Sequence, residues 1–346
     1  MELGKSTPAL QQLRSDGSPV NRRAIFRLAA CLLAAVALSI TLGCSLKPVA
    51  VLRVGLVQWP VNEFFFLARE KGFFREEGVE VQIVEFSTLG DCRRAYERGQ
   101  LDGFGTTVIE VLTAREHSSR SPQMVHINDH SHGADVIVAQ PGIKAFAALK
   151  GRRFGVELST ISVYVLGRAL ELHGLNLTDV KVVPMNTTAM EEAMTKGELD
   201  AAVVYPPYSV TLLRDGSATT VFSSTEIPGE VVDGIAVDAE VARRRPGDVT
   251  KMLRAFWRAV AYTEENPVEA YRFMAEREGI TPAEFQKSLT DGLRLVTEAE
   301  QASYLRPGGK LGPVIDATDR VLRQTGQIKG PDRRADVANG SFAKAE

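Results

Sequence analysis

From residue 52 to residue 205 the sequence alternates short runs of β-branched and apolar residues with stretches of helical periodicity. This alternation is typical of βαβ units, which build a largely parallel sheet with helices on its faces. The pattern predicts strands at 52–57, 79–86, 136–139, 153–157, 180–184 and 201–205, and helices at 63–76, 91–98, 163–173 and 188–196. It therefore restricts the chain to an α/β fold.

Beyond Val237 the pattern becomes helical, and we expect helices at 249–265, 267–277, 282–289 and 313–324. The tail at 329–346 is rich in small and charged residues, which predicts disorder. A length of 346 residues with 44% hydrophobic residues suits two domains, each with its own core. With 41 basic and 43 acidic residues the chain lacks the basic surface that phosphate binding needs, so we expect no nucleic-acid partner.

The first 43 residues have the pattern of an export signal. Arg22, Arg23 and Arg27 precede an apolar run at 28–42, which is shorter than the ~20 residues of a membrane-spanning helix. The residues around Cys44 (Thr-Leu-Gly-Cys) resemble the bacterial lipobox, which predicts lipidation of Cys44 after removal of residues 1–43. The alternative is a plain signal peptide followed by an incidental cysteine.

Two segments repeat the same turn 98 residues apart. Gly-Gln-Leu-Asp-Gly at 99–103 and Gly-Glu-Leu-Asp-Ala at 197–201 each close a helix and open an apolar strand. The physical interpretation is a helix stopped by a left-handed glycine, a tight turn, and a strand entered at aspartate. Such a pair predicts two α/β lobes built alike, with ligand sites at the strand ends between them. The alternative is that any two junctions of this kind favour glycine and aspartate.

Many short motifs in a fixed order give the chain a family resemblance. They lie at 55–60, 66–81, 99–105, 133–139, 149–157 and 199–207. In their order and spacing the chain resembles the substrate-binding proteins of ABC importers, in the branch similar to nitrate, taurine, aliphatic-sulfonate and thiamine-pyrimidine binding proteins. The likeness extends from residue 52 to residue 237.

The resemblance implies a type II periplasmic-binding-protein fold, with two doubly wound sheets joined by a hinge of two crossings. Lobe 1 is expected at 52–131 plus 232–328, and lobe 2 at 132–231. A ligand in the cleft favours the closed form, which docks on a permease with its ATPase subunit. The implied protein is a monomer without a cofactor, held by a lipid on Cys44 at the bacterial membrane and facing the periplasm or the cell exterior.

Ligands of such sheets lie beyond the carboxyl ends of the strands, so we take the residues that follow each strand as candidates. After the first strand, Trp59 is expected to form a cleft wall with Asn62 or Glu63 beside it; the alternative is that Trp59 caps the core of its lobe. Thr106 and Thr107 offer hydroxyls and helix amides to a ligand, or act as N-caps only.

The densest polar stretch, at 129–135, coincides with the first expected crossing. We predict Asp129 and Ser131 as ligand contacts there. One alternative is a zinc site, because His126, His130 and His132 supply suitable ligand types on one face of an extended strand. Another is a solvated hinge loop.

Three carboxylates predict the charge of the ligand. Glu157, Asp129 and Asp233 are expected near one cleft, which disfavours a bare oxyanion and suits an amine, a guanidinium or an N–H-rich ring. No arginine follows a predicted strand end. Ser159 opens a helix whose free amides could receive an anion, which favours a negatively charged ligand instead. Tyr205, before two prolines, is expected to form the second cleft wall.

Catalytic signatures are scarce in this sequence. It contains no GxxxxGK[ST], GxGxxG, HExxH or GxSxG motif, and Cys92 alone does not supply the cysteine-rich motif of the enzymes that resemble this family. We therefore predict an extracytoplasmic solute-binding lipoprotein of an ABC importer that captures a small nitrogen-containing or amine-bearing molecule. The alternatives are an exported enzyme of the same fold and a ligand-sensing subunit of a membrane receptor.

Overall fold

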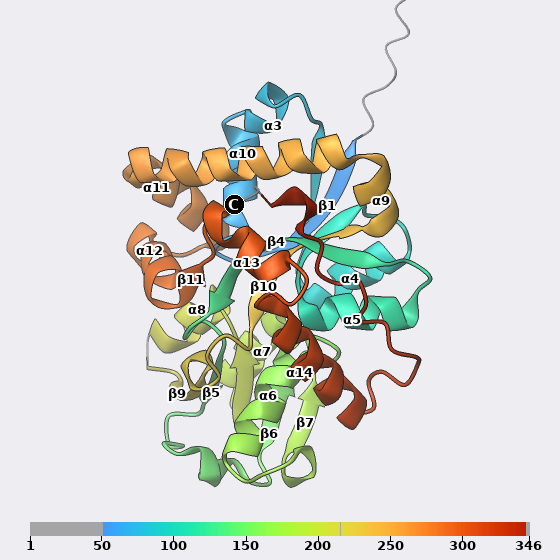
Figure 1. The fold of residues 1–346 in the computed structure, drawn as a ribbon. Coiled ribbons are helices and arrows are strands. Elements are labelled where there is room, and N and C mark those ends of the chain that lie inside the picture. Colours follow the sequence, from blue (N-terminus) through green and yellow to red (C-terminus); the bar gives the residue numbers. More distant parts are fainter. Residues whose placement is uncertain (1–50, 215, 344–346) are drawn as a thin grey trace, which may run out of the picture. The chain divides into compact units, whose positions relative to one another are not determined.

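Two mixed β-sheets organise the chain (Figure 1). The computed structural model describes residues 51–214 and 216–343. The expected signal peptide and Cys44 lie outside these residues. The described residues from 51 onward belong to one compact unit. We call the part around the six-stranded sheet lobe 1 and the part around the five-stranded sheet lobe 2; the boundaries expected from the sequence stay a prediction.

The sheet of lobe 1 has the strand order β11-β4-β10-β3-β1-β2. Its strands are β1 (Leu52–Val57), β2 (Val81–Phe86), β3 (Gly103–Thr107), β4 (Pro122–Ser131), β10 (Val232–Asp238) and β11 (Leu293–Leu295). The first three are parallel, whereas β10 runs antiparallel to β3 and β4. The sheet is therefore mixed: β1, β2, β3 and β4 run in one direction, as expected of a largely parallel sheet, whereas β10 and β11 run in the opposite direction. The reason for β10 is that it returns from lobe 2 and enters the sheet from the opposite end.

Helices cover both faces of this sheet. Leu52, Val54 and Leu56 lie on the same face of β1, because successive side chains of a strand alternate between its two faces. They pack in one apolar cluster with helices that cover that face of the sheet. The helices of lobe 1 on both faces are α2 (Glu63–Glu70), α3 (Phe73–Glu76), α4 (Leu89–Glu97), α5 (Val108–His117), α9 (Ala239–Arg244), α10 (Pro246–Glu265), α11 (Pro267–Glu278), α12 (Pro282–Asp291), α13 (Gln301–Leu305) and α14 (Leu311–Gln324). The helix expected at 63–76 is two helices, since Gly72 between them has a φ of 75°.

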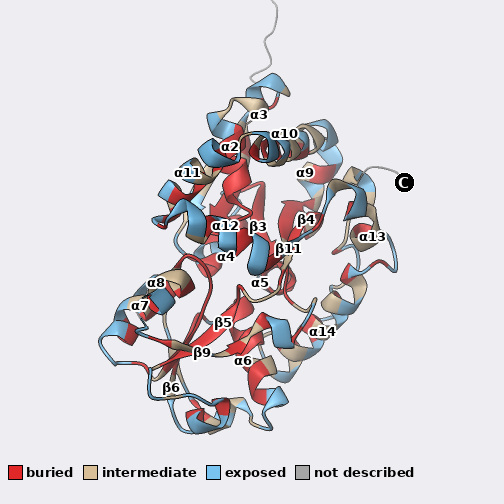
Figure 2. Ribbon diagram, turned by 90° about the vertical axis from the view of Figure 1, so that its left-hand side faces the viewer, coloured by how far each residue is buried: buried red, intermediate tan, exposed pale blue. Residues whose placement is uncertain are grey.

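The sheet of lobe 2 has the order β7-β6-β8-β5-β9. Its strands are β5 (Val136–Ala139), β6 (Arg153–Val156), β7 (Lys181–Pro184), β8 (Ala201–Val204) and β9 (Thr219–Ser223), and its helices are α6 (Ile161–Leu172), α7 (Thr187–Thr195) and α8 (Tyr208–Arg214). Buried residues concentrate in both sheets and on the inner faces of the helices (Figure 2). One apolar cluster runs without interruption from Val57 and Leu89 of lobe 1 to Ile161 of lobe 2, so the lobes are in contact.

The repeated turn occupies equivalent places in the two lobes. Gly99 and Gly197 have φ angles of 76° and 70°, and each precedes a buried strand, as the sequence predicted. Asp102 accepts hydrogen bonds from the backbone N–H of Arg53 (2.8 Å) and its Nη2 (2.8 Å). Asp200 does the same for Arg153, at 2.8 and 3.2 Å. Asp102 thus ties the start of β3 to the start of β1, and Asp200 ties the start of β8 to the start of β6.

The C-terminal tail, for which the sequence predicted disorder, packs against lobe 1 through residue 343. Val337 is fully buried. The backbone N–H of Met124 donates to the carbonyl of Val337 (2.7 Å), and the N–H of Asn339 donates to the carbonyl of Met124 (2.9 Å). β11 pairs with β4 only at residues 129–131, so the rest of that edge needs other hydrogen-bond partners. The tail supplies them at Met124, and the side chain of Gln301 supplies them at Ile127.

None of the helices in the described ranges is long and apolar enough to cross a membrane.

Candidate functional site

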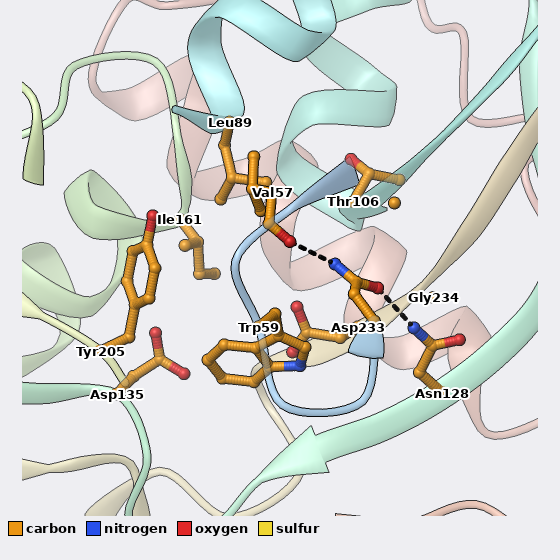
Figure 3. A pocket seen from close by; sticks show the side chains of 12 residues that line it. Val57, Trp59, Leu89, Thr106, Asn128, Asp135, Ile161, Tyr205, Asp233 and Gly234 are labelled. Atoms are coloured by element: carbon orange, nitrogen blue, oxygen red, sulfur yellow. Dashed lines mark hydrogen bonds between the residues drawn. The ribbon is translucent and has the colours of Figure 1, made fainter. Parts of the chain in front are cut away.

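A cavity lies where the carboxyl ends of β1 and β3 face lobe 2 (Figure 3). Lobe 1 contributes most of the residues that line it, namely Val57, Trp59, Asn62, Leu89, Gly105, Thr106, Asn128, Asp233 and Gly234. Asp135 at the first crossing, together with Ile161 and Tyr205 of lobe 2, completes the wall. This is the place where open α/β sheets bind ligands.

Two asparagines hold the loop after β1 in place. Asn62 Nδ2 donates to the carbonyl of Val57 (3.1 Å), and Asn128 Nδ2 donates to Asn62 Oδ1 (3.3 Å), as the dashed lines in Figure 3 show. Asn128 is an extra residue in β4, because Gly234 of β10 pairs with Ile127 while the preceding Asp233 pairs with Asp129. This β-bulge brings Asn128 to the cavity wall, a role that the sequence analysis missed.

The two aromatic residues predicted as cleft walls meet across the cavity. The rings of Trp59 and Tyr205 are 5.9 Å apart at an angle of 71°, in an edge-to-face arrangement. Trp59 Nε1 donates to Asp129 Oδ2 (3.1 Å), which fixes the orientation of the indole. In the view of Figure 3, Tyr205 and Asp135 lie on one side of the indole and Asn128 on the other.

Three aspartates form an acidic cluster at this site: Asp129, Asp135 and Asp233. Among the described residues, Asp129 Oδ1, Asp135 Oδ2 and Asp233 Oδ2 are buried without a hydrogen-bond partner. Burial raises the pKa of all three carboxyls, and mutual repulsion raises the pKa of Asp129 and Asp233 further. The sequence analysis predicted Asp129 and Asp233 and overlooked Asp135. Unpaired buried carboxyl oxygens are costly, and a donor-rich cation would satisfy them.

Glu157 and Glu110 lie close to the cavity, and each bonds to the opposite lobe. The N–H of Gly90 in lobe 1 donates to Glu157 Oε1 (3.0 Å), and burial raises the pKa of Glu157. The N–H of Ile161 in lobe 2 donates to Glu110 Oε1 (3.0 Å). The α6 amide expected to be free for an anion is therefore occupied. Glu110 was missed, although the Thr-x-x-Glu pattern at 107–110 marks it as a capping-box residue.

The other predicted residues divide between the cavity and the scaffold. Thr106 lines the cavity and donates to the carbonyl of Thr107 (3.1 Å). Ser131 lies away from the cavity and holds the crossings together, since its Oγ is 2.7 Å from Ser224 Oγ. Ser159 is half-buried with a φ of 59°, and Thr160 is the N-cap of α6 in its place.

Glu63 does not line the cavity. It is fully buried on α2 and accepts a hydrogen bond from Arg277 Nε (2.6 Å). Burial raises its pKa to about 7, against the opposing charge of Arg277. The prediction that it stands beside Trp59 in the cleft is wrong, because the first turn of α2 directs it toward α11.

The histidines of β4 do not converge. The His126 ring packs against Phe256 and Trp257, with ring centroids 4.9 and 5.1 Å away, and burial lowers its pKa to about 3. Within 51–214 and 216–343, no group of three histidine, cysteine or carboxylate side chains is placed to hold a metal ion. Cys92 is fully buried, and burial raises the pKa of its thiol.

The raised carboxyl pKa values predict that the ligand-free protein loses stability as pH rises. A carboxyl whose pKa is higher in the folded state stabilises the fold below its unfolded pKa and loses that contribution as pH rises through the folded pKa. For Glu63 the window runs from about 4.5 to about 7, and the loss is about 3 kcal/mol. We expect the melting temperature to fall between about pH 6.5 and pH 8, because the opposing gain from His126, whose pKa is lowered to about 3, is complete by about pH 6.5, whereas Glu63 and Asp129 still lose their contributions. A Glu63→Gln variant should show a smaller fall, and a melting temperature that rises with pH in this window would contradict the pKa directions.

Two mixed α/β sheets, two crossings and a cavity at the strand ends between them define the periplasmic-binding-protein fold. The chain belongs to the NMT1/THI5-like family, whose model matches residues 59–270.

Curated relatives and solved structures are similar over most of the chain. A protein of Brucella abortus named as a binding protein is 25% identical over 268 residues, which cover 77% of this chain and 82% of that protein. A 4-amino-5-hydroxymethyl-2-methylpyrimidine phosphate synthase of Legionella pneumophila is 22% identical over 64% of this chain and 72% of its own length. The alkanesulfonate-binding protein SsuA of Xanthomonas axonopodis, solved with MOPS bound, superimposes with a TM-score of 0.70 at 18% identity, covering 84% of this chain and 96% of that one.

Proposed function

We propose that this chain is the extracytoplasmic solute-binding subunit of an ABC importer and that it captures a small cationic or N–H-rich nitrogen compound in the cavity between its lobes. The observation that carries the proposal is the acidic cluster: three buried carboxyl oxygens without hydrogen-bond partners, beside a cavity walled by Trp59 and Tyr205. The relatives named as binding proteins support the general role.

The chemistry of the cavity supports a cation over an oxyanion. An ammonium or guanidinium group supplies several N–H donors, which match the open oxygens of Asp129, Asp135 and Asp233. The faces of Trp59 and Tyr205 attract positive charge through their quadrupoles. Among the described residues that line the cavity none is basic. The ligand proposed for this chain therefore differs in charge from the alkanesulfonate named for SsuA.

The export signal and Cys44 support placement outside the cytoplasm. A lipid on Cys44 would hold the chain beside a permease and its ATPase subunit, as a monomer facing the periplasm or the cell exterior. Binding would favour the closed form by the ligand's differential affinity for it, and the closed form would dock on the permease.

The relatives named as pyrimidine phosphate synthases favour the enzyme alternative. The chain's own residues argue against cysteine chemistry, because Cys92 is fully buried with a raised pKa. Recovery of a ligand unchanged in mass after incubation would exclude the enzyme. The sensing alternative uses the same cavity, and identification of the membrane partner separates it from transport.

A thermal-shift panel tests the proposed ligand class. Small amines, guanidines and aminopyrimidines are compared with methanesulfonate, sulfate and nitrate at equal pH and ionic strength. A ligand at a hundred times its Kd stabilises the fold by about 2.7 kcal/mol, which corresponds to about 5 °C here. We expect such a shift from at least one cation. A shift produced by the anions alone would overturn the proposal.

A further inference from the structure

Two carboxylates span the lobes in a reciprocal pattern. Glu157, at the end of β6 in lobe 2, accepts the N–H of Gly90 in the first turn of α4 in lobe 1. Glu110, on α5 in lobe 1, accepts the N–H of Ile161 in the first turn of α6 in lobe 2. Each lobe therefore gives one carboxylate and receives one at the N-terminus of a helix, where negative charge is favoured.

Each carboxylate keeps one oxygen in its own lobe. Glu110 Oε2 accepts from the N–H (3.0 Å) and the Oγ1 (2.6 Å) of Thr107, which closes the capping box of α5. Glu157 Oε2 is 3.4 Å from Thr187 Oγ1 in lobe 2. Local capping would need no more than these bonds. The second oxygen of each side chain reaches across to the other lobe, and local structure does not account for that.

The crossing bonds lie directly at the cavity wall. Leu89 and Ile161, which line the cavity, are the first residues of α4 and α6, so the bonded amides belong to the same helical turns. Glu110 is fully buried and Glu157 is 7% exposed, so water does not replace these bonds in this structure, in which the lobes are in contact.

We infer that Glu110 and Glu157 form an interlobe clasp that favours the closed form without ligand and, by occupying both helix N-termini, excludes anions from the cleft. The inference deepens the proposed function and rests on it for the role of the cavity. The ligand then enters a site whose anion-binding positions are already filled by the protein's own carboxylates. Selectivity for cations then has two sources: Glu110 and Glu157 block the helix N-termini that would bind an anion, and the acidic cluster attracts a cation.

The test compares the exported protein with its E110Q/E157Q variant, which keeps side-chain volume and removes both charges. We expect small-angle scattering of the ligand-free variant to show a larger radius of gyration, because the closed form loses two charged bonds between the lobes. Methanesulfonate, used as the anion probe in calorimetry, should bind the variant at least tenfold more tightly than the wild type.

The matched control is Glu300→Gln. Glu300 closes a capping box with Thr297 in the same way, but its hydrogen bonds to Thr297 stay within lobe 1. It should change neither the scattering nor the methanesulfonate affinity. Unchanged scattering and unchanged methanesulfonate affinity in E110Q/E157Q would overturn the clasp.

A second variant removes a donor in place of the acceptors. Ile161→Pro deletes the N–H that Glu110 accepts, at a first helical position where proline is tolerated, and Ile161→Val keeps it. The clasp predicts an increased radius of gyration for the proline variant and an unchanged radius of gyration for the valine variant. Equal scattering of the two would count against it. Because these readouts use no cation, a failure of the proposed ligand class in the thermal-shift panel remains distinguishable from a failure of the clasp.

Discussion

Replacing Asp233 by asparagine should lower the affinity for a cationic ligand by about a hundredfold and should raise the melting temperature of the ligand-free protein. The carboxyl of Asp233 has a buried oxygen without a hydrogen-bond partner, and neighbouring Asp129 and Asp135 repel its charge. When a protein carboxylate and a ligand cation form a buried pair, removing the carboxylate costs about 2–5 kcal/mol of binding free energy. Without ligand, the same substitution removes an unpaired buried acid, so the fold gains stability.

Asp238 provides the matched control on the same strand. It is also buried, but Tyr96 Oη (2.8 Å) and Arg120 Nε (3.0 Å) both donate to its Oδ2. Asp238→Asn should lower the melting temperature and leave ligand affinity unchanged. Calorimetry with the most stabilising cation of the panel, combined with thermal unfolding, measures both quantities. If Asp233→Asn destabilised the ligand-free protein and bound the cation normally, the acidic cluster would be part of the scaffold and not the binding site.

Replacing Gly234 by alanine should destabilise the fold by about 3 kcal/mol or more. A Cβ at this position would stand 2.2 Å from the carbonyl oxygen of His126 and 2.7 Å from Met124 Cε. The carbonyl belongs to β4 at the bulge that presents Asn128 to the cavity, so it cannot move without breaking the pairing of β4 and β10. Denaturant unfolding measures the loss.

Gly167 in α6 is the matched control for this substitution, because a Cβ there would meet no atom within 4 Å. Gly167→Ala should stabilise the protein by up to about 1 kcal/mol through helix propensity. Equal stabilities of the two alanine variants would show that β4 and β10 tolerate a wider separation than the structure indicates.

The parts of the site that depend on strand order could be predicted from the sequence. Trp59 follows β1 in lobe 1 and Tyr205 follows β8 in lobe 2, and the residues after the carboxyl ends of the strands in each sheet lie at the cleft between the lobes. The same reasoning placed Thr106 at the cavity, and Asp233 was expected there as one of three carboxylates near the cleft. The repeated turn indicated that the two lobes are built alike. These inferences needed only local pattern and topology.

The parts that depend on how elements meet could not be predicted in this way. Asn128 faces the cavity because of a bulge, which shifts the alternation of β4 by one residue. Glu110 is a capping residue by its local pattern, and only the placement of α6 gives its second oxygen a partner in lobe 2. Composition predicted a disordered tail, but the open edge of β4 orders it.

Mass spectrometry of the small molecule released by gentle denaturation of the exported protein, purified from its native cells, tests the central claim most directly. The account predicts a compound of positive charge or with several N–H donors, released unchanged in mass and rebound by the wild type but not by the Asp233→Asn variant. A sulfonate or another anion that rebinds both forms equally would contradict the account.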